Sequence, residues 1–151
     1  MPNRRRSSSR STTARPAAGT FFPQVRRFIG SANLYYVEFQ RAPVQALPRG
    51  TSPASMGNLH TVCVRMLSTT AGVPVTVSVS VTPTFATLDL GLFVMAPGQR
   101  IQTRGQRVAS SSTGVLGATQ TVTFTPTVTG LYGIVVTNNH EGFGDFTFTV
   151  S

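Results

Sequence analysis

The sequence predicts an all-β domain, a jelly-roll-like β-sandwich of seven or eight antiparallel strands that follows a flexible, basic N-terminal arm. From residue 34 onward, apolar and polar residues alternate with a period of two, as in half-buried strands. No comparable stretch keeps a helical period without an intervening glycine or proline. Residues 1–33 show neither pattern. We therefore expect an arginine-rich arm with a docking segment at 1–33 and a sandwich domain at 34–151.

The clearest strand lies in Pro74–Thr82, where every second residue is a valine and the residues between them are threonine or serine. A helix would scatter these valines around its circumference, whereas a strand places them all on one face. The same alternation predicts further strands at Tyr35–Phe39, Leu59–Leu67, Thr119–Thr125 and Asp145–Ser151. In the last two, the residues expected to face inward are Val122, Phe124, Phe146, Phe148 and Val150.

Two other segments, Leu88–Met95 and Leu131–Thr137, are apolar on both faces. Such segments are typical of central strands in a packed sandwich, where both faces are covered. Residues 99–109 predict one more, weaker strand. The connections Ala96–Gly98 and Thr137–His140 contain residues typical of turns.

The composition excludes several classes of protein. The 151 residues suffice for one domain with its own core, and the charged fraction of 11% is well below that of an ordinary globular domain. The single cysteine, Cys63, excludes an intramolecular disulfide and is expected to be a small packing residue. His60 and His140 are expected in solvated loops, and Asp89 in a structural role. The sequence therefore predicts no catalytic site, no metal site and no cofactor.

Basic charge is concentrated at the N-terminus. All 13 basic residues are arginines, and seven of them precede the first acid, Glu38. These seven are the predicted nucleic-acid-binding residues: Arg4, Arg5, Arg6, Arg10, Arg15, Arg26 and Arg27. A start rich in arginine and serine is also typical of an organellar transit peptide, or of a solvated tail without a binding role. No apolar run has the length of a secretory signal or a membrane span, so we expect neither.

Two further segments are candidates for contacts. The first is too apolar for a free linker and is expected to dock against the domain or a neighbouring chain; its apolar residues are Phe21, Phe22, Phe28 and Ile29. The second contains three arginines without an acid, namely Arg100, Arg104 and Arg107. These either extend the basic surface towards phosphate or protect a solvated edge strand by their charge.

Four segments of the C-terminal half share a pattern with a known family: Val75–Val79, Leu88–Val94, Gln120–Tyr132 and Gly142–Ser151. They contain an alternating valine strand, an aspartate in a Leu-Asp-Leu strand, a Phe-Thr-Pro segment ending in Thr-Gly-Leu-Tyr, and a closing Phe-Thr-Phe-Thr strand. Over residues of about 59–151 the chain resembles bacterial pre-peptidase C-terminal domains. The resemblance implies a non-catalytic, jelly-roll-like module of a kind usually exported and attached to peptidases or surface proteins. Some relatives bind calcium through clustered acids, but the acids here are scattered, so no calcium site is expected.

These observations support three hypotheses about function. The first is a non-enzymatic viral structural protein, shell-forming or shell-decorating, located in the virion. Its arm would contact nucleic acid, and its domain would pack against copies of itself or other shell proteins. The second is a secreted or cell-surface binding or adhesion module similar to the pre-peptidase C-terminal domains. The third is an organellar ribonucleoprotein component with a transit peptide.

Overall fold

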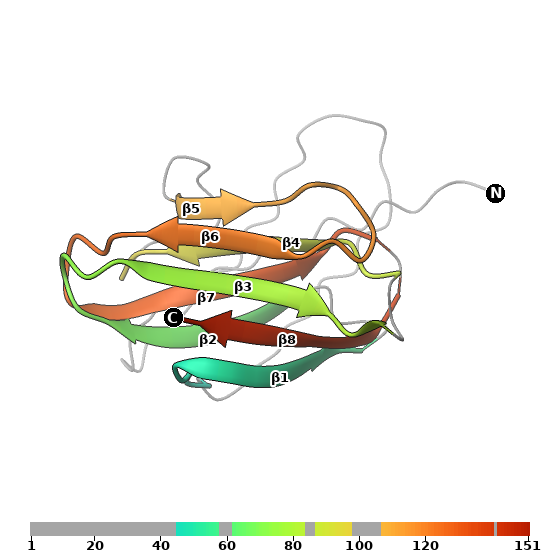
Figure 1. Cartoon of the computed structure of the whole chain (residues 1–151), viewed down its shortest axis with the longest axis horizontal. Coiled ribbons are helices and arrows are strands. Elements are labelled where there is room, and N and C mark those ends of the chain that lie inside the picture. Colours follow the sequence, from blue (N-terminus) through green and yellow to red (C-terminus); the bar gives the residue numbers. More distant parts are fainter. Residues whose placement is uncertain (1–44, 58–61, 84–86, 98–106, 141) are drawn as a thin grey trace, which may run out of the picture.

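The computed structural model describes residues 45–57, 62–83, 87–97, 107–140 and 142–151, which form a sandwich of two β-sheets (Figure 1). The strands are β1 (Gly50–Met56), β2 (Val62–Thr69), β3 (Val75–Val81), β4 (Leu90–Met95), β5 (Arg107–Ser111), β6 (Gln120–Phe124), β7 (Gly130–Asn138) and β8 (Gly144–Val150). The front sheet has the order β1-β8-β3-β6, and the back sheet has the order β2-β7-β4-β5. The predicted all-β sandwich is therefore confirmed, with eight strands in the described residues.

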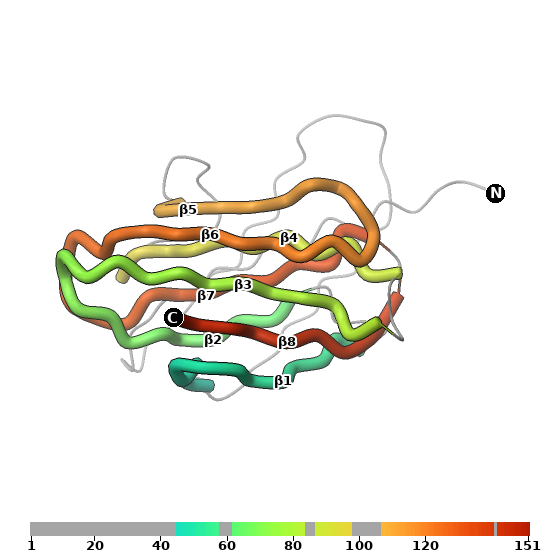
Figure 2. Tube along the Cα trace, in the orientation of Figure 1, coloured from blue at the N-terminus to red at the C-terminus, as the bar shows by residue number. Residues whose placement is uncertain are grey.

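The strands pair in a nested order. β1 pairs with β8, β2 with β7, β3 with β6 and β4 with β5, and all these pairs are antiparallel. This order arises when one long hairpin folds over on itself, which is the jelly-roll topology. Two more antiparallel pairs, β3 with β8 and β4 with β7, complete the sheets. The tube in Figure 2 follows the chain as it passes between the front and back sheets.

The core fills the space between the sheets, because alternate side chains of each strand point there. In β3, the valines at 75, 77 and 79 are at most 1% exposed, as the sequence predicts. Phe124 of the front sheet and Tyr132 of the back sheet pack with ring centroids 5.5 Å apart, which joins the two layers. Val81, the last valine of the predicted series, is half-buried, and the inward-facing residues predicted for β6 and β8 are buried: Val122, Phe146, Phe148 and Val150.

Most predicted strands are found with small shifts at their ends. The correspondences are Leu59–Leu67 with β2, Pro74–Thr82 with β3, Leu88–Met95 with β4, Thr119–Thr125 with β6, Leu131–Thr137 with β7 and Asp145–Ser151 with β8. β4 and β7, the two segments that are apolar on both faces, are the central strands of the back sheet. The weaker strand expected at 99–109 is β5, which starts at Arg107 and ends at Ser111; residues 98–106 lie outside the described residues.

The sequence interpretation missed β1, because its sequence Gly-Thr-Ser-Pro-Ala-Ser-Met contains a proline and few large apolar residues. The strand nevertheless alternates, since Ala54 packs against the core and Met56 is 2% exposed. The strand predicted at Tyr35–Phe39 lies outside the described residues. So does the boundary between residues 33 and 34, and both stay predictions.

Three edge strands carry features that hinder pairing with another chain. Pro53 interrupts the hydrogen-bonding edge of β1, because proline has no N–H group. β5 is short, and Arg107 stands at its start, as expected for an edge strand protected by charge. The edge of β6 is tied to the end of β5 through the buried Gln120, which accepts a hydrogen bond from Ser111 Oγ (2.7 Å) and donates one to Thr113 Oγ1 (2.9 Å).

The alternation of β3 leads to a matched pair of substitutions. Val77 is fully buried, so Val77→Asp places an unpaired charge in the core and is expected to cost at least about 3 kcal/mol of unfolding free energy. Ser78 lies on the opposite face, so Ser78→Asp is expected to be mild. Thermal unfolding followed by circular dichroism measures both. Equal destabilisation by the two substitutions would contradict the assignment of the faces.

Candidate functional site

The outer face of the front sheet is covered by hydroxyl side chains. The residues on this face alternate with the core residues of β1, β8, β3 and β6, and nearly all are serine or threonine. We call this surface the hydroxyl face: Thr51, Ser55, Thr76, Ser78, Ser80, Thr119, Thr121, Thr123, Thr147 and Thr149. They are exposed or half-buried, so the surface they form meets solvent.

The strand register orders these hydroxyl groups into rows. Thr121, Ser78, Thr149 and Thr51 are register partners across all four strands of the front sheet. Neighbouring strands are about 4.8 Å apart, and successive outward residues of one strand are separated by about 6.7 Å. Between β3 and β6 the hydroxyls also bond to each other across the strands; the pairs are Thr76–Thr123 (2.9 Å), Ser78–Thr121 (2.9 Å) and Ser80–Thr119 (3.0 Å). The rows of hydroxyl groups are therefore held in place by both backbone and side-chain hydrogen bonds.

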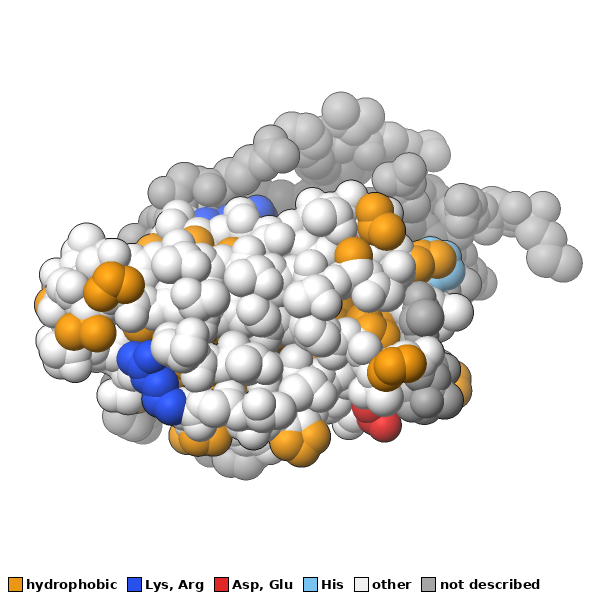
Figure 3. Space-filling model, in the orientation of Figure 1, with side chains coloured by type: hydrophobic (Ala, Val, Ile, Leu, Met, Phe, Trp, Pro, Cys, Tyr) orange, Lys and Arg blue, Asp and Glu red, His pale blue; other side chains and the backbone are white. Residues whose placement is uncertain are grey.

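Charge is nearly absent from the hydroxyl face. Figure 3 views this face and shows charged side chains only near its margins. Among the outward-facing residues of the four described strands, the charged one is Asp145. It lies at the start of β8, opposite Ser55 of β1. A shallow, open hollow of about 450 Å³ lies at this corner, and its lining includes Asp145, Ser55, Pro53, Thr82 and Thr147.

Neutral hydroxyl groups define what this face can bind. Each serine or threonine can donate one hydrogen bond and accept two, so even a bonded pair keeps capacity for a partner. The face has no arginine or lysine with which to neutralise phosphates, and no aromatic ring on which a base or sugar could stack. The arrangement therefore suits an uncharged polar surface rather than a nucleic acid.

The outer face of the back sheet is mainly apolar instead, although Ser68, Ser110 and Thr137 also lie on it. Its residues alternate with core residues such as Leu92 and Ile134, so they point away from the front sheet. We call this surface the apolar face: Val62, Val64, Met66, Phe93, Met95, Leu131 and Val135. The two outer surfaces of one sandwich thus differ in chemistry.

Arg107 is the basic residue that the structure places on the apolar face. Its guanidinium carbon lies 4.4 Å from the centroid of the Phe93 ring, a cation–π contact. The ring lies over Gly91, where an added Cβ would be 3.1 Å from Phe93 Cε2 and 2.7 Å from Thr137 Oγ1. Gly91 is therefore required for the ring to lie flat under Arg107.

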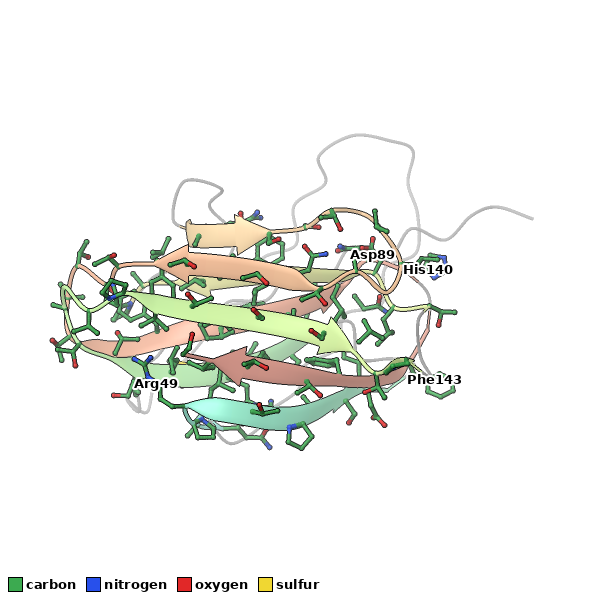
Figure 4. The ribbon with its side chains drawn as sticks, viewed as in Figure 1. Arg49, Asp89, His140 and Phe143 are labelled. Atoms are coloured by element: carbon green, nitrogen blue, oxygen red, sulfur yellow. The ribbon has the colours of Figure 1, made fainter. Side chains whose placement is uncertain are left out.

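At one end of the sandwich, Asn138 joins the segment that precedes β4 to the β7–β8 loop. Its Oδ1 accepts hydrogen bonds from the backbone N–H groups of Asp89 (3.1 Å) and His140 (3.3 Å), and its Nδ2 donates one to Gly142 O (3.4 Å). Asp89 also accepts a bond from Asn139 N at its backbone carbonyl (2.8 Å). Figure 4 shows Asp89 and His140 at this end and Arg49 at the other. The structural role predicted for Asp89 is thus carried by its backbone, while no described residue donates a bond to its buried Oδ1.

The structure describes only some of the sequence-predicted candidates. Cys63 is 7% exposed and belongs to the core, which confirms its packing role. His140 is exposed in the β7–β8 loop, as expected. The other candidates lie outside the described residues and stay predictions: Arg4, Arg5, Arg6, Arg10, Arg15, Arg26, Arg27, His60, Arg100 and Arg104.

The described residues show neither a candidate metal cluster nor a candidate membrane-spanning helix. They contain no group of three or more His, Cys, Asp or Glu side chains that could hold a metal ion. Within the same ranges, no helix has the length and apolarity needed to cross a membrane.

No protein-family model matches the sequence, and no curated protein matches it. Among solved structures, the fold is similar to the pre-peptidase C-terminal domain of collagenase from Bacillus anthracis, with a TM-score of 0.60 and 12% sequence identity. The match covers 76% of this chain and 100% of that domain. The predicted resemblance to pre-peptidase C-terminal domains is therefore confirmed for the fold, and at this identity it extends no further.

Two other structures match less well. One is PliG of Aeromonas hydrophila, a periplasmic inhibitor of g-type lysozyme, with a TM-score of 0.48, 17% identity, and coverage of 72% of this chain and 93% of that one. The other is CorA of Methylomicrobium album BG8, a surface-associated copper-binding protein, with a TM-score of 0.45, 12% identity, and coverage of 68% and 92%. None of the three structures is described as a viral protein.

Two glycines of the back sheet are expected to respond oppositely to alanine. Gly91→Ala forces the Phe93 ring or Thr137 to move and is expected to cost about 1–3 kcal/mol, as other overpacking substitutions do. At Gly133 the new Cβ would meet Met95 Cβ at an ordinary 3.6 Å, so Gly133→Ala is expected to be neutral or to stabilise by up to about 1 kcal/mol. Urea unfolding of both variants checks the prediction, and a tolerated Gly91→Ala would refute the close approach.

Proposed function

We propose that this protein is a non-enzymatic binding module with a pre-peptidase-C-terminal-like fold, and that the hydroxyl face is its binding surface. The observation that carries the proposal is the surface itself, a four-stranded, ordered and exposed array of hydroxyls with charge only at its margin. Ordinary protein surfaces carry about a quarter to a third charged residues, so a sheet face without them is unusual. Its partner is an uncharged polymer rich in hydroxyl or amide groups.

The location that fits this function is outside the cell or on its surface. Uncharged structural polymers are found there, and the fold is shared with a domain attached to a bacterial collagenase. The single cysteine lies in the core, so the domain needs no disulfide to hold its sheets together in that environment.

Removing hydroxyls from one row tests the proposal. Thr121→Val and Thr149→Val keep the shape and the strand preference of threonine but remove its hydrogen-bonding groups. Each lost hydrogen bond is worth about 0.5–1.5 kcal/mol, so the double variant should bind about tenfold more weakly. Cosedimentation with cellulose and chitin fibres measures the affinity. Thr70→Val, in an exposed loop, is the matched control and should bind as the unchanged protein does.

Absence of binding to both polymers would argue against the proposal, as would equal binding by the double variant and the unchanged protein. Circular dichroism of each variant verifies that the sandwich is intact.

A virion structural protein is the second candidate, favoured by two specific observations. The nested strand order is the jelly-roll topology, which is common in viral shells. The seven arginines that precede Glu38 supply an acid-free segment suited to packaged nucleic acid. In this case the domain would pack against copies of itself or other shell proteins.

The salt dependence of nucleic-acid binding tests the second candidate. If all seven arginines contact phosphates, log K should fall with log salt with a slope of about −6 on duplex DNA. Replacing Arg4, Arg5, Arg6, Arg10 and Arg15 by alanine should flatten that slope by about 3 to 5. Filter binding between low and physiological salt gives both values. An unchanged slope would show that these arginines are not the binding element, and the virion hypothesis would lose its main support.

A further inference from the structure

The described charges lie at opposite ends of the sandwich. The two described acids, Asp89 and Asp145, stand just before β4 and at the start of β8, and both strands start at the same end. Among the described arginines, Arg49 precedes β1 and Arg107 starts β5, and these two strands start at the opposite end. The third described arginine, Arg65, lies in the middle of β2. We call the two ends the acidic end and the basic end; Figure 4 labels Asp89 at the first and Arg49 at the second.

Exposed apolar side chains gather at the same two ends. Apart from Val108 of β5, the large apolar residues that are exposed in the described part of the chain lie in or beside the end loops. Each of them is between 46% and 56% exposed, which leaves about half of the side chain in contact with water. They are Val73, Val128 and Leu131 at the basic end, and Val115, Leu116 and Phe143 at the acidic end.

Hydrogen bonds hold the loops that carry these residues. At the basic end, Gly72 N donates to Pro126 O (2.9 Å), so the β2–β3 and β6–β7 loops lie side by side. At the acidic end, Gly117 N donates to Leu88 O (2.9 Å), which joins the β5–β6 loop to the segment before β4. Both ends are therefore ordered before a partner arrives, and little conformational entropy is lost when one binds.

The strand order gives the two ends matching patterns of charge. Arg49 precedes β1 and Asp145 starts β8, and these strands are neighbours in the front sheet. Arg107 starts β5 and Asp89 precedes β4, and these strands are neighbours in the back sheet. If one copy follows another along the strand direction, each arginine of the basic end is displaced sideways from an acid of the acidic end by one strand spacing, about 4.8 Å. Opposite charges at such a distance attract each other.

We propose that copies of this chain associate end to end, with the basic end of one copy against the acidic end of the next. The exposed apolar residues of the two ends meet in this contact, and Arg49 and Arg107 of one copy lie beside Asp145 and Asp89 of the other. Because the two ends differ, the contact is heterologous and repeats along the strand direction instead of closing a dimer. A contact between like ends would bring like charges together, which disfavours it.

The size of an end determines how strong the contact can be. Each sheet is three strand spacings wide, about 14 Å, and the two sheets are about 10 Å apart. With its side chains an end covers roughly a few hundred Å², less than the ~800 Å² that each partner buries in a standard stable interface. We therefore expect a weak, reversible association that increases with protein concentration.

The contact also keeps the sheets of successive copies in line. One pair of opposite charges belongs to the front sheet and the other to the back sheet, so front sheet follows front sheet from copy to copy. The hydroxyl faces then form one continuous surface, on which many weak sites act together on the same polymer. Only this consequence rests on the proposed function; the end-to-end contact itself does not.

Charge reversal at the two ends tests the contact in the full chain, without any polymer present. In sedimentation equilibrium at physiological salt, the average mass should rise with protein concentration. Arg49→Asp and Asp145→Arg should each weaken the association at least about tenfold, because each places like charges in contact. Ser78→Asp, in the middle of the hydroxyl face, is the control and should leave the association unchanged.

Two recombinations make the test specific for unlike ends. The chain that carries both Arg49→Asp and Asp145→Arg should associate as the unchanged protein does, since its two ends again have opposite charges. An equimolar mixture of the two single variants should also associate, because the unaltered acidic end of one variant meets the unaltered basic end of the other.

A mass equal to that of one chain at every concentration would overturn the proposal. So would an association that Asp145→Arg removes and Arg49→Asp leaves intact, because another basic segment would then be the partner. Failure of both recombinations to restore the association would show that like ends meet. Circular dichroism verifies the fold of each variant; if Asp145→Arg unfolds, Asp145→Asn replaces it and should weaken the association several-fold. Loss of polymer binding in cosedimentation would leave this result unaffected, so the two proposals fail separately.

Discussion

Every feature of this molecule depends on one constraint, the strict alternation of side chains along a strand. In β3 the valines at 75, 77 and 79 enter the core, and this alone forces Thr76, Ser78 and Ser80 to the outside. The same rule holds in the other strands of both sheets, so choosing the core side chains also determines the two outer surfaces. The feature that distinguishes this sandwich is therefore the chemistry of the residues that face outward from its two sheets.

The outward-facing positions carry hydroxyl side chains on the front sheet and mainly apolar side chains on the back sheet. The front sheet uses serine and threonine, whose short side chains tolerate water and bond across strands, as between Ser78 and Thr121. The back sheet uses valine, methionine and phenylalanine, and it includes Gly91 and Gly133, which open space beside Phe93 and Met95. An apolar surface of the second kind is typical of a site of contact with another surface, whereas a hydroxyl surface is compatible with water. The asymmetry explains why β4 and β7 are apolar on both faces while β3 is apolar on one.

The sequence was sufficient for the fold wherever local alternation was strong. It predicted β3, β6 and β8 with their inward residues, and the double apolarity of β4 and β7 correctly placed them at the centre of a sheet. It failed at β1, where pairing with β8 and not local preference makes Gly50–Met56 a strand. The rows of the hydroxyl face were also beyond sequence reasoning. Thr51 and Thr149 are nearly a hundred positions apart, and only the nested pairing makes them neighbours.

The division of the surface also limits how the two candidate functions can be combined. A polyanion requires cations, and the described cation that faces outward from the back sheet is Arg107, while the hydroxyl face has none. A neutral polymer requires dense, fixed hydrogen-bonding groups, and these lie on the front sheet. In a secreted module the hydroxyl face would meet the polymer; in a shell it would meet the exterior or a neighbouring subunit. Both functions therefore leave the front sheet free of contact with a polyanion.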